Sequence, residues 1–271
     1  MTELITSAAN PLVRRVRQLA DRRHRRREGA FVVQGIQPVW QAVEAGADIE
    51  ALLVAPELLR HDGARAMVAA QEAAGQRVAR LSAELFGRIA DRDGPSGLAA
   101  IVATRSLQPA LADLRAGPDA VFTALHLAGN PGNLGTIIRT VSAAGGDGII
   151  LIGPSADPFD PAAVKASMGA LFSVPVATAP GGREFLDWAR AAGVTVAATS
   201  ARGSVSCWAA PLRPPLAILL GSEGAGLPDD LLAAADLRVA IPMTGTAESL
   251  NLAVAAGVLL YEVRRRTWAA S

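Results

Sequence analysis

The chain has 271 residues, of which 51% are apolar, a formal net charge of +1 and one cysteine, Cys207. The length permits two domains, and a lone cysteine excludes an internal disulfide. No apolar run is long enough to span a membrane, and the N-terminus lacks the apolar stretch of a signal peptide. We therefore expect a cytoplasmic α/β protein with no membrane partner. No metal is expected either, because no His or Cys partners accompany Cys207.

The positive charge is concentrated near the N-terminus. Residues 14–27 hold eight arginines and one aspartate, a net of +7, which leaves −6 for the rest of a chain whose total is +1. Such a run is often a solvated or flexible face. Arginine, however, pairs bidentately with phosphate oxygens, and a concentrated basic arm is what counterion release on nucleic acid requires. We interpret the segment as a phosphate-binding arm.

In the first half of the chain, apolar runs alternate with helical patterns. The runs predict strands at 30–35, 49–56, 76–81 and 97–104. The patterns predict helices at 37–46, 61–75 and 82–91, the last capped by Ser82. Strands and helices that take turns indicate a mostly parallel sheet covered by helices. Prolines and a glycine then break the rhythm, so we place a domain boundary there, with a first domain at 1–106 and a linker at 107–118.

The second half, 119–271, starts the alternation again. We predict strands at 120–129, 148–153, 194–200, 216–221 and 237–243. The helices are predicted at 133–146, 161–170, 183–193, 228–235 and 247–267. The last helix is apolar on nearly every side and should be mostly buried. It becomes basic only at 264–266, where cations suit the negative end of the helix dipole.

The first candidate loop lies in "LHLAGNPGNLGTIIRT", residues 125–140. Its glycines are spaced G-x-x-G-x-x-G, which differs from the dinucleotide fingerprint, and no carboxylate ends the following strand. A phosphate-binding Gly-Lys-Ser/Thr sequence is missing too. A glycine turn before a helix explains the glycines alone. It does not explain Asn133 and Arg139, which stand in an otherwise apolar segment.

The second loop is "LAILLGSEGAGLP", residues 216–228. Glu223 stands between small residues just past an aliphatic strand, at the rim where α/β proteins bind ligands. Gly221, Gly224 and Gly226 free the backbone to adopt positive φ and to approach a ligand closely. A polar N-terminal region for the next helix is the alternative reading.

The third loop is "VAIPMTGTAESLNLAVAAG", residues 239–257. Ser249 could simply cap the last helix. Asn251 is harder to explain structurally, because asparagine is a poor helix former and a buried amide must find hydrogen-bond partners.

Together and in this order, "NPGNLGTIIRT", "LLGSEGAGLP" and "IPMTGTAESLNLAVAAG" resemble the three motifs of the SpoU/TrmH family of RNA 2′-O-ribose methyltransferases. That family belongs to the SPOUT superfamily, whose C-terminal segment threads into a trefoil knot. The resemblance covers about residues 120–266, including "KASMGALFSVPV". The first half, from "EGAFVVQGIQPVWQAVEAG" onward, is similar to a small RNA-binding domain that resembles certain ribosomal proteins. The resemblance implies an α/β protein in which this domain precedes a knotted methyltransferase domain.

The resemblance also implies S-adenosylmethionine as cofactor and a homodimer whose active sites form where catalytic domains meet. Backbone groups near Gly221, Ile241 and Leu250 would hold the adenine, and Thr199 is a further candidate for the same pocket. The implied catalytic residues are Arg139, Asn133, Glu223, Ser249 and Asn251. Asn133 would orient Arg139 or the ribose, while Glu223 would anchor the loops or pair with Arg139. The RNA-binding residues expected in the arm are Arg22, Arg23, Arg25, Arg26 and Arg27.

By resemblance, Arg139 activates the ribose 2′-hydroxyl. A guanidinium is a poor general base because its pKa lies above about 12. We therefore interpret Arg139 as a cation that stabilises the developing alkoxide and clamps the adjacent phosphate. Large-subunit rRNA is favoured over tRNA as substrate because of the extra domain and its arginines. The alternatives are a tRNA methyltransferase, a non-catalytic RNA-binding protein and a nucleotide-dependent oxidoreductase.

Overall fold

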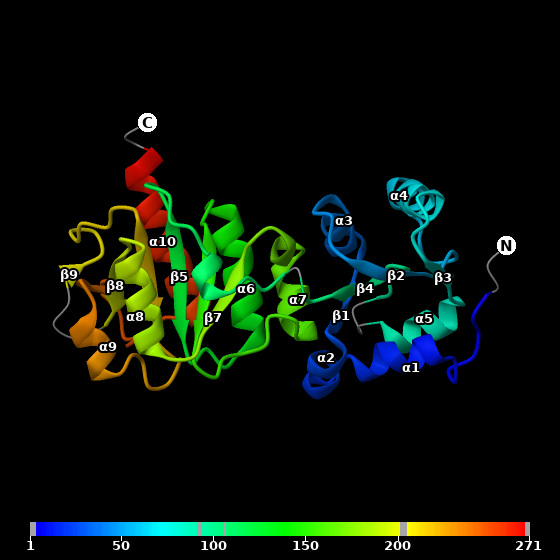
Figure 1. Ribbon diagram of the computed structural model, residues 1–271, viewed down its shortest axis with the longest axis horizontal. Helices are drawn as coiled ribbons and strands as arrows, with labels where there is room; N and C mark the ends of the chain where they lie inside the picture. The colour runs from blue at the N-terminus through cyan, green and yellow to red at the C-terminus, as the bar shows by residue number, and fades with distance from the viewer. Residues whose placement is uncertain (1–3, 91–93, 106, 201–204, 269–271) are drawn as a thin grey trace. The chain divides into compact units, whose positions relative to one another are not determined.

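The computed structural model describes residues 4–90, 94–105, 107–200 and 205–268. These residues form two compact units. The first unit comprises Met1–Leu107 and Phe159–Ser173, and the second comprises Gln108–Pro158 and Val174–Ser271. Each unit has its own β-sheet with helices packed against it (Figure 1). Among the described residues, no helix combines the length and the apolar character needed to cross a bilayer.

The first unit contains a four-stranded sheet in the order β1-β4-β2-β3. Its strands are β1 (Ala30–Gln34), β2 (Ile49–Val54), β3 (Val78–Arg80) and β4 (Leu98–Ala103). Its helices before residue 107 are α1 (Pro11–Gln18), α2 (Arg22–Glu28), α3 (Ile36–Glu44), α4 (Asp62–Ala73) and α5 (Ala83–Ile89). The predicted elements are therefore present, and the Ser82 side chain caps α5 as expected.

The prediction of a mostly parallel sheet is wrong for this first unit. Only β2 and β3 pair in parallel, whereas β4 runs antiparallel to both β1 and β2. The six residues of β4 are all buried, so β4 is the central strand of the unit. Alternation along the sequence does not determine strand direction, because a strand that is inserted between two others can enter from either end.

The arginine-rich segment folds as two helices, α1 and α2, and is not a flexible arm. Pro11 occupies the first turn of α1, and Leu12, Val13 and Val16 are buried on one face. The Asp21 side chain caps α2, which ends at Gly29 with a φ of 62°. In the apolar core of the unit, α1 packs with α5 and the sheet. The arginines are therefore displayed from ordered helices.

The segment Phe159–Ser173 belongs to the first unit although it lies within the second half of the sequence. It contains α7 (Pro161–Ser167) and a short 3₁₀ turn, η2 (Ala170–Phe172). The Phe31 ring of β1 lies 4.6 Å from the Phe159 ring, centroid to centroid. The predicted helix 161–170 ends early because Met168 adopts a left-handed conformation, with a φ of 51°.

The second unit has a seven-stranded sheet in which every pair is parallel, as predicted for this half of the chain. Its order is β7-β6-β5-β10-β8-β11-β9. The strands are β5 (Val121–His126), β6 (Gly148–Ile152), β7 (Val176–Ala179), β8 (Thr195–Thr199), β9 (Val205–Ser206), β10 (Leu216–Leu220) and β11 (Leu237–Ala240). The strands β7 and β9 are short and were not predicted from the sequence.

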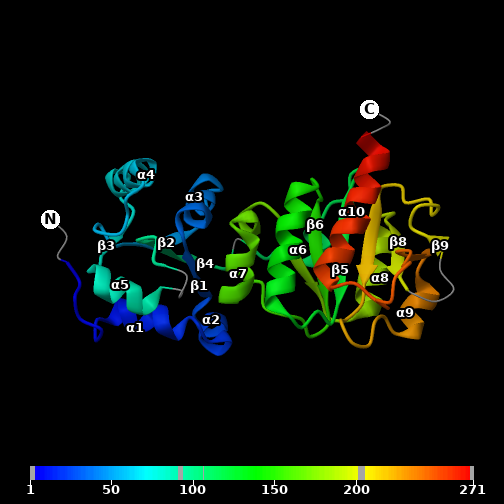
Figure 2. The same ribbon diagram turned by 180° about the vertical axis from the view of Figure 1, so that it is seen from behind.

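Helices cover both faces of this sheet. They are α6 (Pro131–Ala143), α8 (Gly182–Ala191), α9 (Asp229–Ala234) and α10 (Leu252–Trp268). Figure 1 shows α8 and α9 in front of the sheet, and Figure 2 shows α6 and α10 on the opposite face. The central strands β5, β6 and β10 are buried almost throughout, which explains their continuous aliphatic sequences.

The last helix begins later than predicted. Residues 242–250 form an exposed loop, and α10 starts at Leu252. Near its other end, the buried Arg264 donates hydrogen bonds from Nε to the Ala144 carbonyl, at 2.8 Å, and from Nη2 to the Gly145 carbonyl. The basic residues at 264–266 therefore do more than complement the helix dipole, because Arg264 ties α10 to the end of α6.

Replacing Arg264 with methionine is expected to destabilise the protein by about 2–3 kcal/mol, because two carbonyls beneath α10 would lose their donor. Urea unfolding followed by circular dichroism would measure the change. Arg183→Met is the control. The Arg183 side chain is 91% exposed and its partner Asp187 is 59% exposed, so its removal should leave the midpoint close to the wild-type value. Equal losses for both variants would contradict this role of Arg264.

Candidate functional site

The three loops follow parallel strands of the second unit. They come after β5, β10 and β11, and parallel strands direct their carboxyl ends to the same edge of a sheet. β5 and β10 are direct neighbours, with Leu125 opposite Leu220, so Gly221 continues beside the end of β5. Thr199 ends β8, which lies between β10 and β11, and it pairs with Val239. Gly221, Thr199 and Ile241 therefore lie at the carboxyl ends of three adjacent strands, β10, β8 and β11.

Asn133 joins all three loops through its side-chain amide. Its Nδ2 donates to Glu223 Oε1 at 2.5 Å, and its Oδ1 accepts from Asn251 Nδ2 at 3.1 Å. These contacts link residues 90 and 118 positions apart in the sequence. We call the Asn133, Glu223 and Asn251 set the Asn133 bridge. The bridge uses both the donor and the acceptor of the Asn133 amide. An aspartate or a leucine at position 133 has a similar size but could not supply both groups.

Local capping places the Asn133 bridge at the start of two helices. The Asn130 side chain caps α6 by accepting from the Asn133 N–H at 3.1 Å. The Asn251 Oδ1 accepts from the Ala253 N–H at 2.9 Å, so Asn251 caps α10. The expectation that Asn251 lies buried within the helix is wrong, because Asn251 is exposed and precedes the first turn. Its two partners are the cap and the bridge, and an N-cap position suits asparagine.

Glu223 anchors the loops through Asn133. Of the two roles considered for this carboxylate, the described contacts show the anchoring one and no pairing with Arg139. Asn133 likewise bonds to Glu223 and Asn251 and does not orient Arg139 within the described chain. Ser249 is exposed in the third loop, makes no hydrogen bond with any described residue and does not cap α10.

Arg139 lies on the exposed surface of α6, six residues after Asn133. Six residues correspond to about 9 Å along a helix axis. Its guanidinium makes no hydrogen bond or ion pair with any residue that the structure describes. The Arg139 guanidinium presents several N–H donors from an ordered helix. Because no described residue occupies these donors, they can bind an anionic group from outside the chain.

The glycines of the second loop have different functions from those expected. Only Gly226 has a positive φ, of 68°. At Gly221 a Cβ would lie 2.1 Å from the Gly226 carbonyl carbon, so a side chain there would collide with the returning loop. Ser222 and Gly226 exchange backbone hydrogen bonds of 3.2 and 3.1 Å that close this turn. The close approach at Gly221 is therefore made by the chain's own backbone.

The third loop leaves main-chain polar groups available. In the described structure, no backbone N–H or C=O group from 242 to 250 bonds to another backbone group. Ile241 is half-buried at the start of this loop, and Leu250 is 37% exposed at its end. Free backbone groups between apolar side chains fit the edge of a purine, which needs few side-chain contacts. This donor set is compatible with the adenine of S-adenosylmethionine.

His126 is a residue of this edge that the sequence analysis missed. It ends β5 beside Gly221, and its Nδ1 is buried without a hydrogen-bond partner among the described residues. Burial lowers the pKa of His126, partly opposed by the Asp230 carboxylate. The sequence feature that could have identified His126 is a histidine at the end of an otherwise apolar strand. The next residue, Leu127, has a positive φ of 53°, which is uncommon for a leucine.

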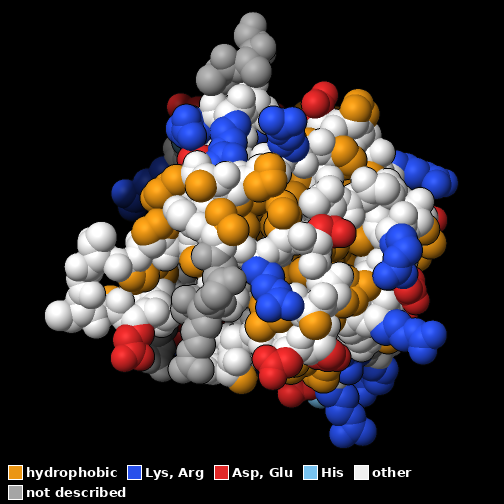
Figure 3. All heavy atoms as spheres, turned by 90° about the vertical axis from the view of Figure 1, so that its left-hand side faces the viewer, with side chains coloured by type: hydrophobic (Ala, Val, Ile, Leu, Met, Phe, Trp, Pro, Cys, Tyr) orange, Lys and Arg blue, Asp and Glu red, His pale blue; other side chains and the backbone are white. Residues whose placement is uncertain are grey.

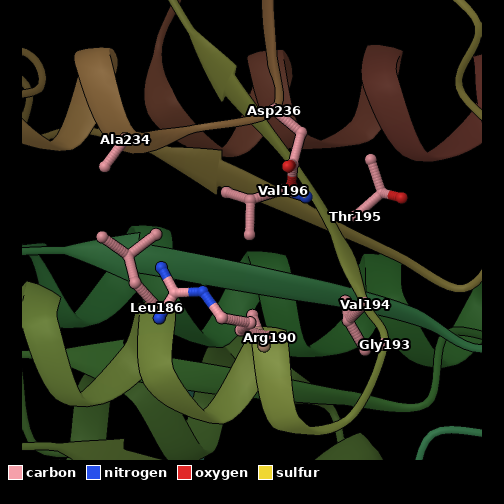
Figure 4. Close-up of a pocket in the computed structure, with 9 residues that line it drawn as sticks. Leu186, Arg190, Gly193, Val194, Thr195, Val196, Ala234 and Asp236 are labelled. Atoms are coloured by element: carbon pink, nitrogen blue, oxygen red, sulfur yellow. Dashed lines mark hydrogen bonds between the residues drawn. The ribbon is translucent and has the colours of Figure 1, made fainter.

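A cavity of about 240 Å³ lies elsewhere in the second unit, at the amino end of β8. Figure 4 shows Arg190 and Asp236 among its lining residues. The Asp236 Oδ2 accepts a hydrogen bond from the Val196 N–H at 2.8 Å, so this carboxylate is already used within the sheet. None of the predicted site residues lines the cavity. Within the described residues, no group of three or more His, Cys, Asp or Glu side chains could hold a metal ion.

The predicted RNA-binding arginines of α2 fall into two groups. Arg22, Arg23, Arg26 and Arg27 are exposed. Arg25 is 2% exposed and donates to the Leu19 and Ala20 carbonyls at 3.1 and 2.7 Å. Its Nη2 also lies 3.3 Å from Asp160 Oδ2. We therefore withdraw Arg25 from the RNA-binding set, because its donors hold the end of α1 and the start of α7.

Comparison with known proteins agrees with this arrangement. The family model of the SpoU rRNA methylase family matches residues 120–261, and the model of the MRM3-like substrate binding domain matches residues 10–100. A 23S rRNA (uridine(2479)-2′-O)-methyltransferase from Streptomyces viridochromogenes is 32% identical, covering 92% of this chain and 87% of that one. The 23S rRNA (guanosine(2553)-2′-O)-methyltransferase RlmP of Bacillus subtilis is 30% identical, covering 96% of this chain and 98% of that one.

Among solved structures, the AdoMet-bound rRNA methyltransferase from Sinorhizobium meliloti superposes with a TM-score of 0.89 at 37% identity and covers 98% of both chains. The fold and the loop site thus define an α/β methyltransferase with a separate substrate-binding unit. The chain belongs to the SpoU rRNA methylase family.

Proposed function

We propose that the protein transfers a methyl group from S-adenosylmethionine to a ribose 2′-oxygen of RNA, with 23S rRNA as the substrate. The observation that carries this proposal is the Asn133 bridge, which brings the three loops together on the helix that also carries the exposed Arg139, a residue with no partner among the described residues. The names of the relatives in Streptomyces viridochromogenes and Bacillus subtilis support the reaction and the substrate. The AdoMet-bound neighbour supports the cofactor.

Each loop has a distinct part in the proposed site. Backbone groups near Gly221, Ile241 and Leu250 hold the adenine, with Thr199 at the end of the adjacent strand. The cofactor supplies an electrophilic methyl group on a sulfonium sulfur. The Asn133 bridge fixes the loops so that the cofactor and the ribose are aligned for in-line displacement. Ser249 contacts the target nucleotide from the exposed third loop.

Arg139 acts on the accepting ribose. As the 2′-hydroxyl loses its proton, negative charge grows on its oxygen, and a guanidinium stabilises that charge while its second donor holds the neighbouring phosphate. Arg139 acts as a cation and not as the base, because a guanidinium does not accept a further proton. The hydroxyl proton goes to that phosphate or to water.

A homodimer is part of the same proposal. Leu250, Val254 and Tyr261 are large apolar side chains that remain 37%, 51% and 47% exposed. Val254 and Tyr261 are seven residues apart on α10, so they lie on one face of the helix. A second copy that covers this face would place Arg139 from one protomer near the loops of the other. Trefoil threading of the C-terminal segment and a cytoplasmic location also belong to this proposal.

We propose that residues 1–106 bind the RNA, that 107–118 link the domains and that 119–271 carry out methyl transfer. The exposed arginines Arg22, Arg23, Arg26 and Arg27 would contact phosphates. Replacing Arg23 and Arg26 together with alanine should weaken binding to an rRNA fragment. The salt dependence of log K should also become shallower by about 1.5. Fluorescence anisotropy at several salt concentrations measures both quantities.

The exposed pair Arg183 and Arg190 on α8 provides the control for this experiment. Alanine at these two positions removes the same charge from the second unit and should leave the salt dependence nearly unchanged. Equal effects of the two double variants would indicate that net charge, and not the α2 surface, determines binding.

A competition assay tests the substrate class. Purified protein is incubated with labelled S-adenosylmethionine and an equimolar mixture of unmodified 23S rRNA and tRNA. We expect label in the 23S rRNA. Label in tRNA would favour the tRNA alternative, and no label in either RNA would favour a non-catalytic RNA-binding protein.

A further inference from the structure

Trp208 is an exposed aromatic side chain that the proposed reaction does not use. Its side chain follows β9 and is 53% exposed. Cys207 directly before it and Ala210 two residues after it are buried, at 0% and 1% exposure, whereas Ala209 is exposed. The exposure of the indole is therefore not a consequence of a loosely packed segment.

Hydrogen bonds fix the turn that carries Trp208. The Ser206 Oγ accepts from the Trp208 N–H at 3.3 Å, and the Ser206 carbonyl accepts from the Ala209 and Ala210 N–H groups, both at 2.9 Å. Arg266 of α10 donates from Nη2 to the Cys207 and Trp208 carbonyls at 2.7 and 2.8 Å, and from Nη1 to the Ala210 carbonyl. An ordered turn presents an aromatic ring at little entropic cost on binding.

Glu262 orients the arginine that holds this turn. Its side chain is 4% exposed, and Oε1 accepts from Arg266 Nε at 2.7 Å. Hydrogen bonds from Arg265 and then Arg266 lower the pKa of Glu262, so it is a carboxylate at neutral pH. Two arginines against one carboxylate leave this cluster with a net positive charge.

The turn is also next to the proposed cofactor loop. β9 pairs with β11, and the Cys207 N–H donates to the Ala240 carbonyl at 2.8 Å. Ile241 follows Ala240 directly. Trp208 thus lies near the start of the third loop.

Hydrophobic side chains gather on the face of the second unit that includes β9, with several Lys and Arg side chains along their upper edge and scattered Asp and Glu side chains elsewhere on the face (Figure 3). An apolar surface bordered by positive charge suits a nucleic acid, whose bases stack on aromatic rings and whose phosphates pair with arginine. A second copy of the chain carries the same positive border and would repel it. On α10, arginines follow Tyr261 within about one turn, whereas Val254 precedes Arg265 by about three turns, so the start of this α10 face is the better dimer contact.

We propose that the indole of Trp208 is a stacking platform for an unpaired base of the RNA substrate, with the cations of α10 beside its phosphate. This inference rests on the proposed function, because it assigns the RNA a second contact in the second unit. The platform recognises the ring face of the base and so does not select a particular nucleotide. It adds RNA affinity close to the site, independently of the α2 arginines.

The test compares Trp208→Ala, Trp208→Phe and Val205→Ala. Val205 is 54% exposed on β9, three residues before Trp208, and is the matched control, because it is apolar but cannot stack. For Trp208→Ala we expect the dissociation constant and KM for an rRNA fragment to rise at least about fivefold. Trp208→Phe should restore most of the affinity. Val205→Ala should keep the wild-type affinity and KM for the rRNA fragment. All three variants should keep the wild-type dissociation constant for S-adenosylmethionine.

Fluorescence gives a readout that a structural role would not change. RNA should quench the emission component that disappears in Trp208→Phe. Unchanged RNA affinity in Trp208→Ala, or no quenching of that component, would overturn the platform. If Trp208→Ala changed the protein from dimer to monomer in sedimentation velocity, Trp208 would contact a second copy of the chain instead of RNA. A wild-type protein that binds RNA but transfers no methyl group would defeat the proposed function and leave this binding test intact.

Discussion

Replacing Arg139 with lysine is expected to lower kcat for methyl transfer by about 100-fold or more, and Arg139→Ala should lower it further. Lysine keeps the positive charge but loses the planar fork that would hold the alkoxide and the phosphate together. Loss of one preorganised donor to a developing oxyanion typically costs about 100- to 1,000-fold in kcat. Single-turnover transfer of labelled methyl to an rRNA fragment measures the change directly.

Folding should be unaffected in these variants. Arg139 is exposed and bonds to no described residue, so unfolding midpoints should match the wild type. The S-adenosylmethionine dissociation constant should also be retained. Arg213→Ala, at another exposed arginine, serves as the control and should leave kcat unchanged. Near-wild-type activity in Arg139→Lys would show that a positive charge alone suffices for catalysis and that the planar guanidinium geometry does not contribute.

Asn133→Asp is expected to reduce methyl transfer by about 100-fold and to weaken cofactor binding. The new carboxylate would face Glu223 at a position where the amide Nδ2 now donates over 2.5 Å. Two carboxylates at this distance repel each other, so the second loop would move away from α6. Loss of alignment of this kind costs rate even without a direct contact to the reacting atoms. Equilibrium dialysis and single-turnover kinetics measure the two effects.

The polarity of the contact can be reversed to test the Asn133 bridge. In the double variant Asn133→Asp with Glu223→Gln, the glutamine amide would donate to the new carboxylate, which can still accept from Asn251. We expect the double variant to recover at least about tenfold of the activity lost in Asn133→Asp. No recovery would indicate that Asn133 contacts substrate directly and that the 2.5 Å hydrogen bond is incidental.

The sequence allowed a candidate site to be predicted because its polar residues stand in apolar surroundings. Asn133, Glu223 and Asn251 each follow an aliphatic strand, and parallel strands bring such positions to one edge. The periodicity of the second half likewise predicted its parallel sheet. Family resemblance supplied the roles, and the structure adds the connections among the loops that residue types alone do not define.

Other features depend on tertiary contacts that the local sequence does not encode. Arg25 reads as one more member of a basic run, yet it is buried because its donors meet carbonyls at the end of α1. The direction of β4 depends on where it inserts between β1 and β2. Asn251 falls inside the predicted helix 247–267, whereas its side chain starts α10 as a cap.

The chemical position of the transferred label tests the central claim most directly. An unmodified 23S rRNA is methylated with labelled S-adenosylmethionine and then digested with alkali, which cleaves RNA only where the 2′-hydroxyl is free. We expect the label to be recovered in alkali-resistant dinucleotides and Arg139→Ala to produce almost none. Label recovered in mononucleotides would place the methyl group on a base and would contradict methylation of the ribose.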